Sequence, residues 1–161
     1  MSQYIFTHTF NIPYSAIINS YNKRFDHQNH KIIRYLKNID IINDSESETT
    51  RKLHLEIDDI PTYLGYITGN ICIISHKIIH EENRLNIKIE NETLSNVFSI
   101  NESCYFEKID ENITKFTENL SSEMKTNVYG KNMIEDFAMS KYKSFYDSGE
   151  FVEQIMTHLN V

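Results

Sequence analysis

The fold is decided by the stretch from Met133 to Leu159, which reads MIEDFAMSKYKSFYDSGEFVEQIMTHL. Apolar residues recur in it at steps of three and four, a spacing that places them along one face of an α-helix. These residues are Ile134, Phe137, Ala138, Tyr142, Phe145, Val152, Ile155, Met156 and Leu159. A helix of this length extends roughly 40 Å at about 1.5 Å per residue. Because most helical stability comes from packing of the apolar face, the rest of the chain must cover it.

The two ends and the middle of this helix also have sequence signals. Asn132 followed by Glu135 fits an N-cap with its capping-box partner. The acids Glu135 and Asp136 favour a helix N-terminus, where the macrodipole stabilises negative charge. Gly149 is expected to kink or end the helix, since glycine costs about 1 kcal/mol in a helix interior relative to alanine.

Lys141 is a charged residue on the apolar face of this helix. It lies four residues after Phe137 and four before Phe145, so it points the same way as they do. One interpretation is a lysine that lays its stem on apolar surface and extends its ammonium to water. The other is a cation held in an apolar cavity to bind an anion, and the pattern alone leaves both open.

The bulk properties favour one domain over residues 1–161 and exclude some partners. The chain has 161 residues and 40% hydrophobic residues, enough for one core. A net charge of −7 argues against nucleic acid as a partner. No apolar run approaches the length of a membrane span. Cys72 and Cys104 are expected to be buried hydrophobic residues, with a disulfide between them left open.

The rest of the chain reads as one strand, one helix and six more strands. Alternating residues predict a strand over Tyr4–Phe10, and Pro13 predicts the start of a helix that ends near Asn22 to Phe25. Further strands are expected over Lys31–Ile42, Thr50–Ile57, Ile71–His80, Arg84–Glu90, Val97–Ile109 and Ile113–Leu120. Their short connections require antiparallel neighbours, so the predicted class is α+β, with helices on one face of an antiparallel sheet.

The segment from Ile60 to Gly69 is unusually apolar for a loop. It contains one of the two prolines and two of the four glycines. Its proline and apolar side chains, Ile60, Pro61, Tyr63, Leu64, Tyr66 and Ile67, suggest a lid or a contact surface. A short helix packed on the sheet is the alternative.

No catalytic or cofactor motif is present, so we expect neither catalysis nor a cofactor or metal. There is no Gly-rich phosphate loop, GxSxG, HExxH or CxxC. His76 and His80 fall four apart in a predicted strand and share a face, but no third ligand is evident. We expect that face to be solvated.

Four segments, in order, resemble the PRELI domain (slowmo) family. The opening Phe6-Thr7-His8-Thr9-Phe10-Asn11-Ile12-Pro13-Tyr14, followed by Arg24-Phe25, is similar to the family's strand-to-helix opening. Thr50-Arg51 and Ile60-Pro61-Thr62-Tyr63-Leu64 with Gly69 resemble its strand and lid segment. Glu102-Ser103-Cys104-Tyr105 and Ile134-Glu135-Asp136-Phe137 with Lys141-Tyr142 resemble its later strand and long helix. The similarity covers about residues 4–160.

The resemblance implies a fold and a function. The fold is a concave antiparallel sheet of about seven strands that grips a long C-terminal helix, with a short N-terminal helix and a lid loop, a START-like or helix-grip architecture. The family carries one anionic phospholipid, phosphatidic acid or phosphatidylserine, between the outer and inner mitochondrial membranes. It works in the intermembrane space, contacts membranes transiently and binds a small helical-hairpin partner with twin Cys-x9-Cys motifs.

Carried over by motif, the resemblance assigns the lipid headgroup to four basic residues, Arg24, Lys31, Arg51 and Lys141. The sequence departs from the family pattern at Asp26-His27-Gln28, at Leu55-Glu56 and near Ser148, where the family has Pro-Asn-Pro and basic residues. The main alternative is a helix-grip enzyme or ligand-binding domain for a small apolar molecule. Such an enzyme needs an acid–base pair deep in its cavity, and we expect the inward side chains to be aromatic and aliphatic with isolated cations.

Overall fold

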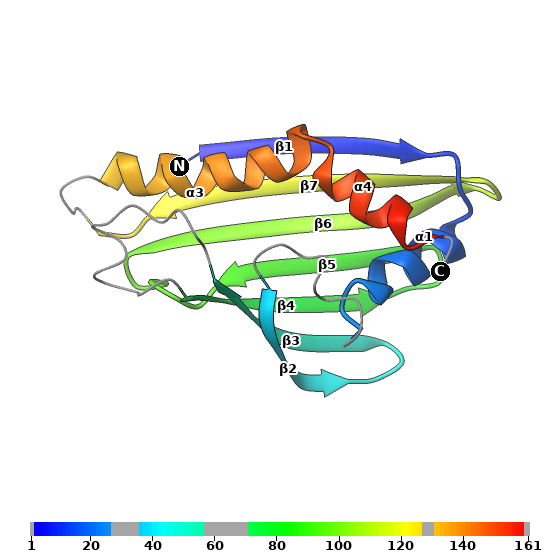
Figure 1. The fold of residues 1–161 in the computed structure, drawn as a ribbon, viewed down its shortest axis with the longest axis horizontal. Coiled ribbons are helices and arrows are strands. Elements are labelled where there is room, and N and C mark those ends of the chain that lie inside the picture. The colour runs from blue at the N-terminus through cyan, green and yellow to red at the C-terminus, as the bar shows by residue number, and fades with distance from the viewer. Residues whose placement is uncertain (1, 27–35, 57–70, 127–130, 160–161) are drawn as a thin grey trace.

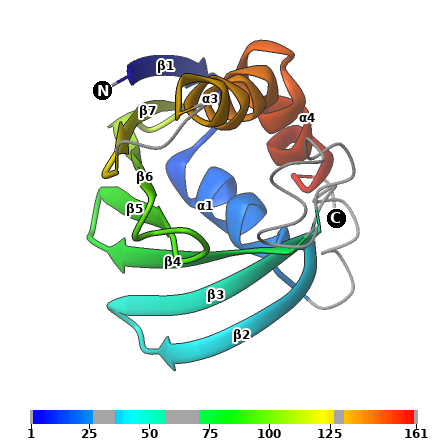
Figure 2. The same ribbon diagram turned by 90° about the vertical axis from the view of Figure 1, so that its left-hand side faces the viewer.

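A curved antiparallel sheet with helices on its concave side makes up the described part of the protein, as Figure 1 and Figure 2 show. The computed structural model describes residues 2–26, 36–56, 71–126 and 131–159. The strands are β1 (Ser2–Phe10), β2 (Leu36–Asp44), β3 (Glu48–Glu56), β4 (Ile71–His80), β5 (Arg84–Asn91), β6 (Phe98–Asp110) and β7 (Ile113–Met124). The helices are α1 (Tyr14–Lys23), α3 (Lys131–Asp147) and α4 (Glu150–Thr157). This arrangement confirms the predicted α+β class and the helix-grip architecture.

The strand order across the sheet is β1-β7-β6-β5-β4-β3-β2, with every neighbouring pair antiparallel. Strands β2 to β7 therefore follow the chain, and β1 returns to pair with β7. The predicted strand over Lys31–Ile42 corresponds to β2, which runs from Leu36 to Asp44, and residues 31–35 lie outside the described part of the chain. An alternating pattern of apolar and polar residues can predict strands of this sheet because successive side chains face opposite sides of it.

Pro13 caps α1 at its N-terminus, and the backbone N–H groups of Ala16 and Ile17 donate to its carbonyl. The helix lies inside the curve of the sheet, as the end-on view in Figure 2 shows. Its residue Ser20 donates through its hydroxyl to the Ile155 carbonyl in α4. Helix α1 therefore packs between the sheet and helix α4.

The C-terminal stretch is two helices, which corrects the prediction of one helix from Met133 to Leu159. Gly149 adopts φ +81° and precedes α4, so the chain leaves the helical conformation there, as its glycine suggested. The N-cap prediction at Asn132 is wrong, because α3 already begins at Lys131. Met156 is 44% exposed, so it does not belong to the buried face. No helix among the described residues combines the length and hydrophobicity needed to cross a bilayer.

The main core lies between the sheet, α1 and α4. It is a cluster of aromatic and aliphatic side chains that includes Phe106, Phe116, Tyr146, Phe151 and Ile155. The Phe116 and Phe151 rings lie 4.4 Å apart between centroids. Because this core fills one end of the concave face, the remaining space under α3 is left as a cavity.

Candidate ligand-binding site

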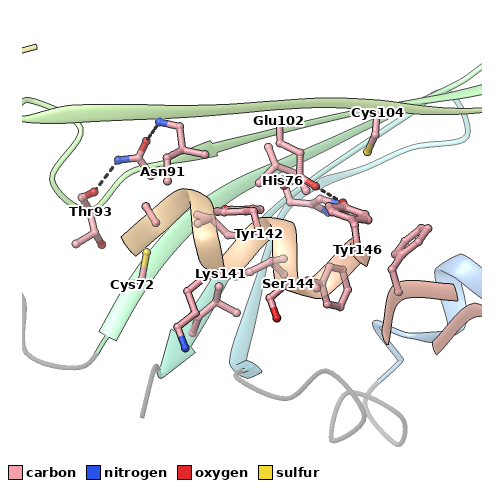
Figure 3. Close-up of a pocket in the computed structure, with 18 of the residues that line it drawn as sticks. Cys72, His76, Asn91, Thr93, Glu102, Cys104, Lys141, Tyr142, Ser144 and Tyr146 are labelled. Atoms are coloured by element: carbon pink, nitrogen blue, oxygen red, sulfur yellow. Dashed lines mark hydrogen bonds between the residues drawn. The ribbon is translucent and has the colours of Figure 1, made fainter. Parts of the chain in front are cut away.

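A cavity of about 410 Å³ lies between α3 and the concave face of the sheet, and Figure 3 shows part of its lining. This volume falls within the usual range for small-molecule sites, about 300–1,000 Å³. Most of the lining is apolar, including Leu53, Leu55, Ile74, Ile89, Phe137 and Phe145. A few polar and charged side chains interrupt it, and these decide what chemistry the cavity can perform.

Arg24, directly after α1, is the most deeply buried cation of the cavity. Arg24 is 6% exposed. Its guanidinium carbon lies 5.1 Å from the Tyr21 ring centroid and 5.5 Å from the ring centroids of Phe25 and Phe151. Burial lowers the pKa of this guanidinium, although arginine remains charged. The Arg24 Nε atom has no hydrogen-bond acceptor among the described residues. A buried donor without an acceptor is rare and calls for an explanation.

Arg51 also lies against Phe25, with its guanidinium carbon 4.4 Å from that ring centroid. In the register of β3 and β4 it lies opposite His76. Burial lowers the pKa of Arg51, and its Nε and Nη1 atoms also have no acceptor in the described part of the chain. Arg51 adjoins the cavity without being one of the residues that line it.

His76 is fully buried, with 0% of its surface exposed, which corrects the expectation of a solvated histidine face. Its Nε2 atom lies 2.9 Å from the Tyr21 hydroxyl oxygen, and its Nδ1 atom has no partner among the described side chains. Burial, with the charges of Arg51 and Arg24, holds the pKa of His76 well below its usual value. His76 is therefore neutral and offers one ring nitrogen to a ligand.

A buried acidic group lies further along the same cavity. Glu102 on β6 accepts a hydrogen bond from the Tyr146 hydroxyl of α3, and both residues are labelled in Figure 3. A Glu102 oxygen, a Glu118 oxygen and the Cys104 sulfur all lie within 4.8 Å of one another. These inward-facing acids correct the expectation that the cavity contains only aromatic and aliphatic side chains with isolated cations.

Lys141 lines the cavity, a position that the sequence pattern had left open. Its Nζ atom lies 5.5 Å from the Phe137 ring centroid, and in Figure 3 its amine points away from Glu102 and His76. The structure therefore separates Lys141 from the polar groups near Arg24. Lys31 and the predicted lid residues Ile60, Pro61, Tyr63, Leu64, Tyr66 and Ile67 lie outside the described residues.

The free thiols of Cys72 and Cys104 resolve the question of a disulfide, since neither cysteine is bridged. Burial raises the pKa of both thiols. Cys104 is buried, as the sequence suggested, whereas Cys72 is only half-buried.

Sequence comparison places the chain in a family. Residues 15–160, nearly the whole chain, match the PRELI-like family. The chain belongs to the PRELI-like family. No curated protein matches it by sequence. The family match confirms the resemblance drawn from the four motifs.

Solved structures similar to this PRELI-like protein share its fold at low sequence identity. Ara h 8.0201 is 16% identical, with a TM-score of 0.62 over 99% of both chains. The ZhuI aromatase/cyclase of Streptomyces sp. R1128 is 11% identical, with a TM-score of 0.61 over 99% of this chain and 93% of its own. A START superfamily protein of Mycobacterium smegmatis is 13% identical, with a TM-score of 0.54 over 98% and 97%. Family and fold together suggest lipid or ligand binding.

Proposed function

We propose that this protein binds one anionic glycerophospholipid, phosphatidic acid, in its cavity and transfers it between the outer and inner mitochondrial membranes. Phosphatidylserine is the alternative ligand within the same class. The observation that carries the proposal is a group of buried N–H donors without acceptors among the described residues, with Arg24 in the lining of an apolar cavity and Arg51 beside it. These donors suit an anionic headgroup, and the apolar lining suits acyl chains.

The phosphate is assigned to Arg24, with Arg51 and His76 beside it. Arg24 and Arg51 have guanidinium N–H groups without an acceptor among the described residues, and both guanidinium groups lie against the Phe25 ring. A phosphate oxygen accepts strong, charge-assisted hydrogen bonds from such groups. Binding would therefore satisfy donors that are costly to leave buried without an acceptor.

Lys141 is assigned a different role from Arg24 and Arg51 because it occupies a different position. It lines the same cavity from α3, and its amine points away from Glu102 and His76 (Figure 3). Its ammonium is a compact positive charge, which attracts an anion in the cavity or on a nearby membrane surface. We assign it, with Lys31, to guiding or retaining the headgroup, and this assignment follows the family motif.

Membrane contact is assigned to the apolar segment from Ile60 to Gly69. Acyl chains are too apolar to cross water exposed, so a carrier must cover them in transit and open at the bilayer. With a net charge of −7, basic patches alone do not explain binding to an anionic membrane. Apolar insertion by this segment supplies the missing contribution.

Two further parts of the proposal come from the family resemblance. The protein works in the mitochondrial intermembrane space, and it binds a small helical-hairpin protein with twin Cys-x9-Cys motifs. Protease treatment of mitochondria tests the first part: the protein should resist protease until the outer membrane is ruptured. Co-expression tests the second: full transfer activity by a monodisperse, monomeric protein without a partner would count against it.

An enzyme acting on a small apolar molecule is the second candidate, and one observation favours it. The Glu102, Glu118 and Tyr146 side chains form a buried group that can hold and move a proton. General acid–base catalysis requires such a group within reach of a substrate. The carrier remains the better proposal because the unpaired arginine donors suit a bound anion.

A liposome assay tests the proposed function. Donor vesicles carry fluorescent phosphatidic acid or phosphatidylcholine, and acceptor vesicles carry neither. We expect the protein to move phosphatidic acid and to move phosphatidylcholine much more slowly, because the latter adds a cation near the arginines. Failure to extract either lipid would refute the carrier function.

A further inference from the structure

Among the described residues that line the cavity, Glu102 and Arg24 are buried side chains of opposite formal charge. Glu102 is 3% exposed and lines the cavity from the middle of β6. The Tyr146 hydroxyl donates to its Oε1 atom, which fixes the carboxyl group in place, as Figure 3 shows. A carboxylate buried beside a proposed anion site needs a reason, because it repels any ligand oxygen that carries no proton.

Glu118 explains how this carboxylate is tolerated. It is 0% exposed, and one of its carboxyl oxygens lies within 4.8 Å of a carboxyl oxygen of Glu102. Two carboxyl groups this close are stable when they share one proton. Burial and the charge of Glu102 raise the pKa of Glu118 to about 10, and burial also raises the pKa of Glu102, so the pair holds one proton and carries one negative charge. The Tyr146 hydroxyl donates to Glu102 and, at 3.4 Å, to Glu118, and the hydrogen bonds of Tyr146 and Glu118 favour the ionised form of Glu102.

Apart from Arg24, the described titratable groups around Glu102 are neutral, so Glu102 is the hydrogen-bond acceptor available to a ligand in the cavity. Burial raises the pKa of Glu102, while hydrogen bonds from Tyr146 and Glu118 and the charge of Arg24 oppose that rise. The neighbouring titratable groups Tyr21, Cys104, Tyr142 and Tyr146 have raised pKa values and stay neutral, and His76 is neutral because its pKa is lowered. An anion at Arg24 thus lies in the same cavity as one fixed carboxylate.

We propose that Glu102 is a specificity-determining residue that accepts a hydrogen bond from the P–OH group of a singly charged phosphomonoester headgroup. This inference rests on the proposed function and deepens it. A phosphodiester of the same charge has no P–OH, so its oxygens would face the carboxylate without a proton between them. A site built to pair with a hydroxyl rejects the analogue that lacks it, because a buried polar group is then left unpaired.

Two lipids of equal charge and equal acyl chains make the sharpest test, dioleoyl phosphatidic acid and dioleoyl phosphatidylmethanol. The wild-type protein should transfer phosphatidic acid at least about tenfold faster, the factor that one hydrogen bond to a charged group supplies. Glu102→Gln should reduce that ratio to below about threefold, because a carboxamide no longer repels the diester. Glu90→Gln is the matched control, since Glu90 lies on the neighbouring strand in a surface ion pair with Lys88 and should leave the ratio unchanged.

A second measurement needs no variant, in case Glu102→Gln fails to fold. A phosphomonoester loses its second proton at a pH of about 6. The preference of the wild-type protein for phosphatidic acid over phosphatidylmethanol should therefore fall between pH 5 and pH 8, as P–OH is lost. A ratio that is constant or rises over this range would overturn the inference.

The outcomes separate this inference from the proposed function. Equal transfer of both lipids by the wild-type protein, or an unchanged ratio in folded Glu102→Gln, overturns the role of Glu102 and leaves the carrier function standing. Transfer of neither lipid refutes the carrier function, and the inference falls with it.

Discussion

Replacing Arg24 with methionine should weaken lipid binding without weakening the fold. Methionine keeps an unbranched apolar stem of similar length and removes the charge and its N–H donors. In the structure, that charge is buried and its Nε atom has no acceptor among the described residues. Exchanging a buried charge for an apolar side chain of similar volume is often neutral or stabilising.

The magnitudes follow from the contacts of Arg24. Loss of one hydrogen bond to the phosphate costs about 1.5–3 kcal/mol of binding free energy, because both partners are charged. That loss corresponds to a dissociation constant weaker by a factor of roughly 10 to 150. The ring contacts with Tyr21, Phe25 and Phe151 contribute about 0.5–2 kcal/mol to folding stability, and removal of the desolvated charge offsets their loss.

Two measurements on the same preparation test this prediction. Lipid transfer between liposomes should fall at least about tenfold, while the melting temperature of the lipid-free protein stays the same or rises. Arg84→Met is the matched control, since the Arg84 guanidinium carbon lies 3.7 Å from the Tyr105 ring centroid, away from the cavity lining. A lower melting temperature with normal transfer in Arg24→Met would show that Arg24 stabilises the fold and does not bind the ligand.

Three further predictions test other parts of the account. Lys141→Ala should slow transfer of anionic lipid and leave the circular dichroism spectrum unchanged, and an undiminished rate would remove Lys141 from the site. Changing Tyr63 and Leu64 to aspartate should abolish extraction of lipid from liposomes with the sheet still folded; a normal rate would mean that the segment is not a lid. Because Glu118 binds a proton in the folded state up to a pH of about 10 but is ionised when unfolded, the free energy of unfolding should fall from pH 6 to pH 8, by at most about 1.4 kcal/mol per unit. Glu118→Gln should flatten that slope in denaturant titrations, and an equally steep slope in the variant would contradict the shared proton.

The sheet could be predicted from the sequence because its strands alternate between a buried and an exposed face. In β5, for example, Leu85 and Ile87 are buried and Lys88 is exposed. Short polar turns then force antiparallel neighbours. The return of β1 to pair with β7 depends on contacts distant in sequence, and no local pattern contains that information.

The C-terminal helices show where helical periodicity fails. The residues from Ile134 to Phe145 keep a regular spacing, and Ile134 is buried. Gly149, with its positive φ, interrupts the helix and changes the direction of the chain. The apolar spacing of α3 therefore does not predict which face of α4 is buried. Phe151 is therefore buried and Met156 exposed, although the continuous pattern favoured Met156.

The site was predicted only in part. Lys141 could be found from its place on an apolar helical face, and Arg24 and Arg51 came from the family motifs. The sequence contained a usable signal for His76, which shares a strand face with the buried residues Ile74 and Ile78.

For Glu102 and Glu118, the alternating pattern gives the face of the sheet but not the distance between the two side chains. Alternation with Ile100 and Phe106 places Glu102 on the inner face, and alternation with Phe116 and Leu120 does the same for Glu118. Their proximity depends on the register of β6 and β7, which sets Cys104 opposite Glu118 and Glu102 opposite Leu120. Register is fixed by packing across the whole sheet.

Native mass spectrometry of the protein, purified from a lipid-containing host without detergent, tests the central claim most directly. The account predicts a complex with one phospholipid per chain, and fragmentation should identify phosphatidic acid as its main component. The Arg24→Met protein, prepared in parallel, should retain much less of it. A wild-type protein that carries no phospholipid, or that carries a neutral one as readily as an anionic one, would contradict the account.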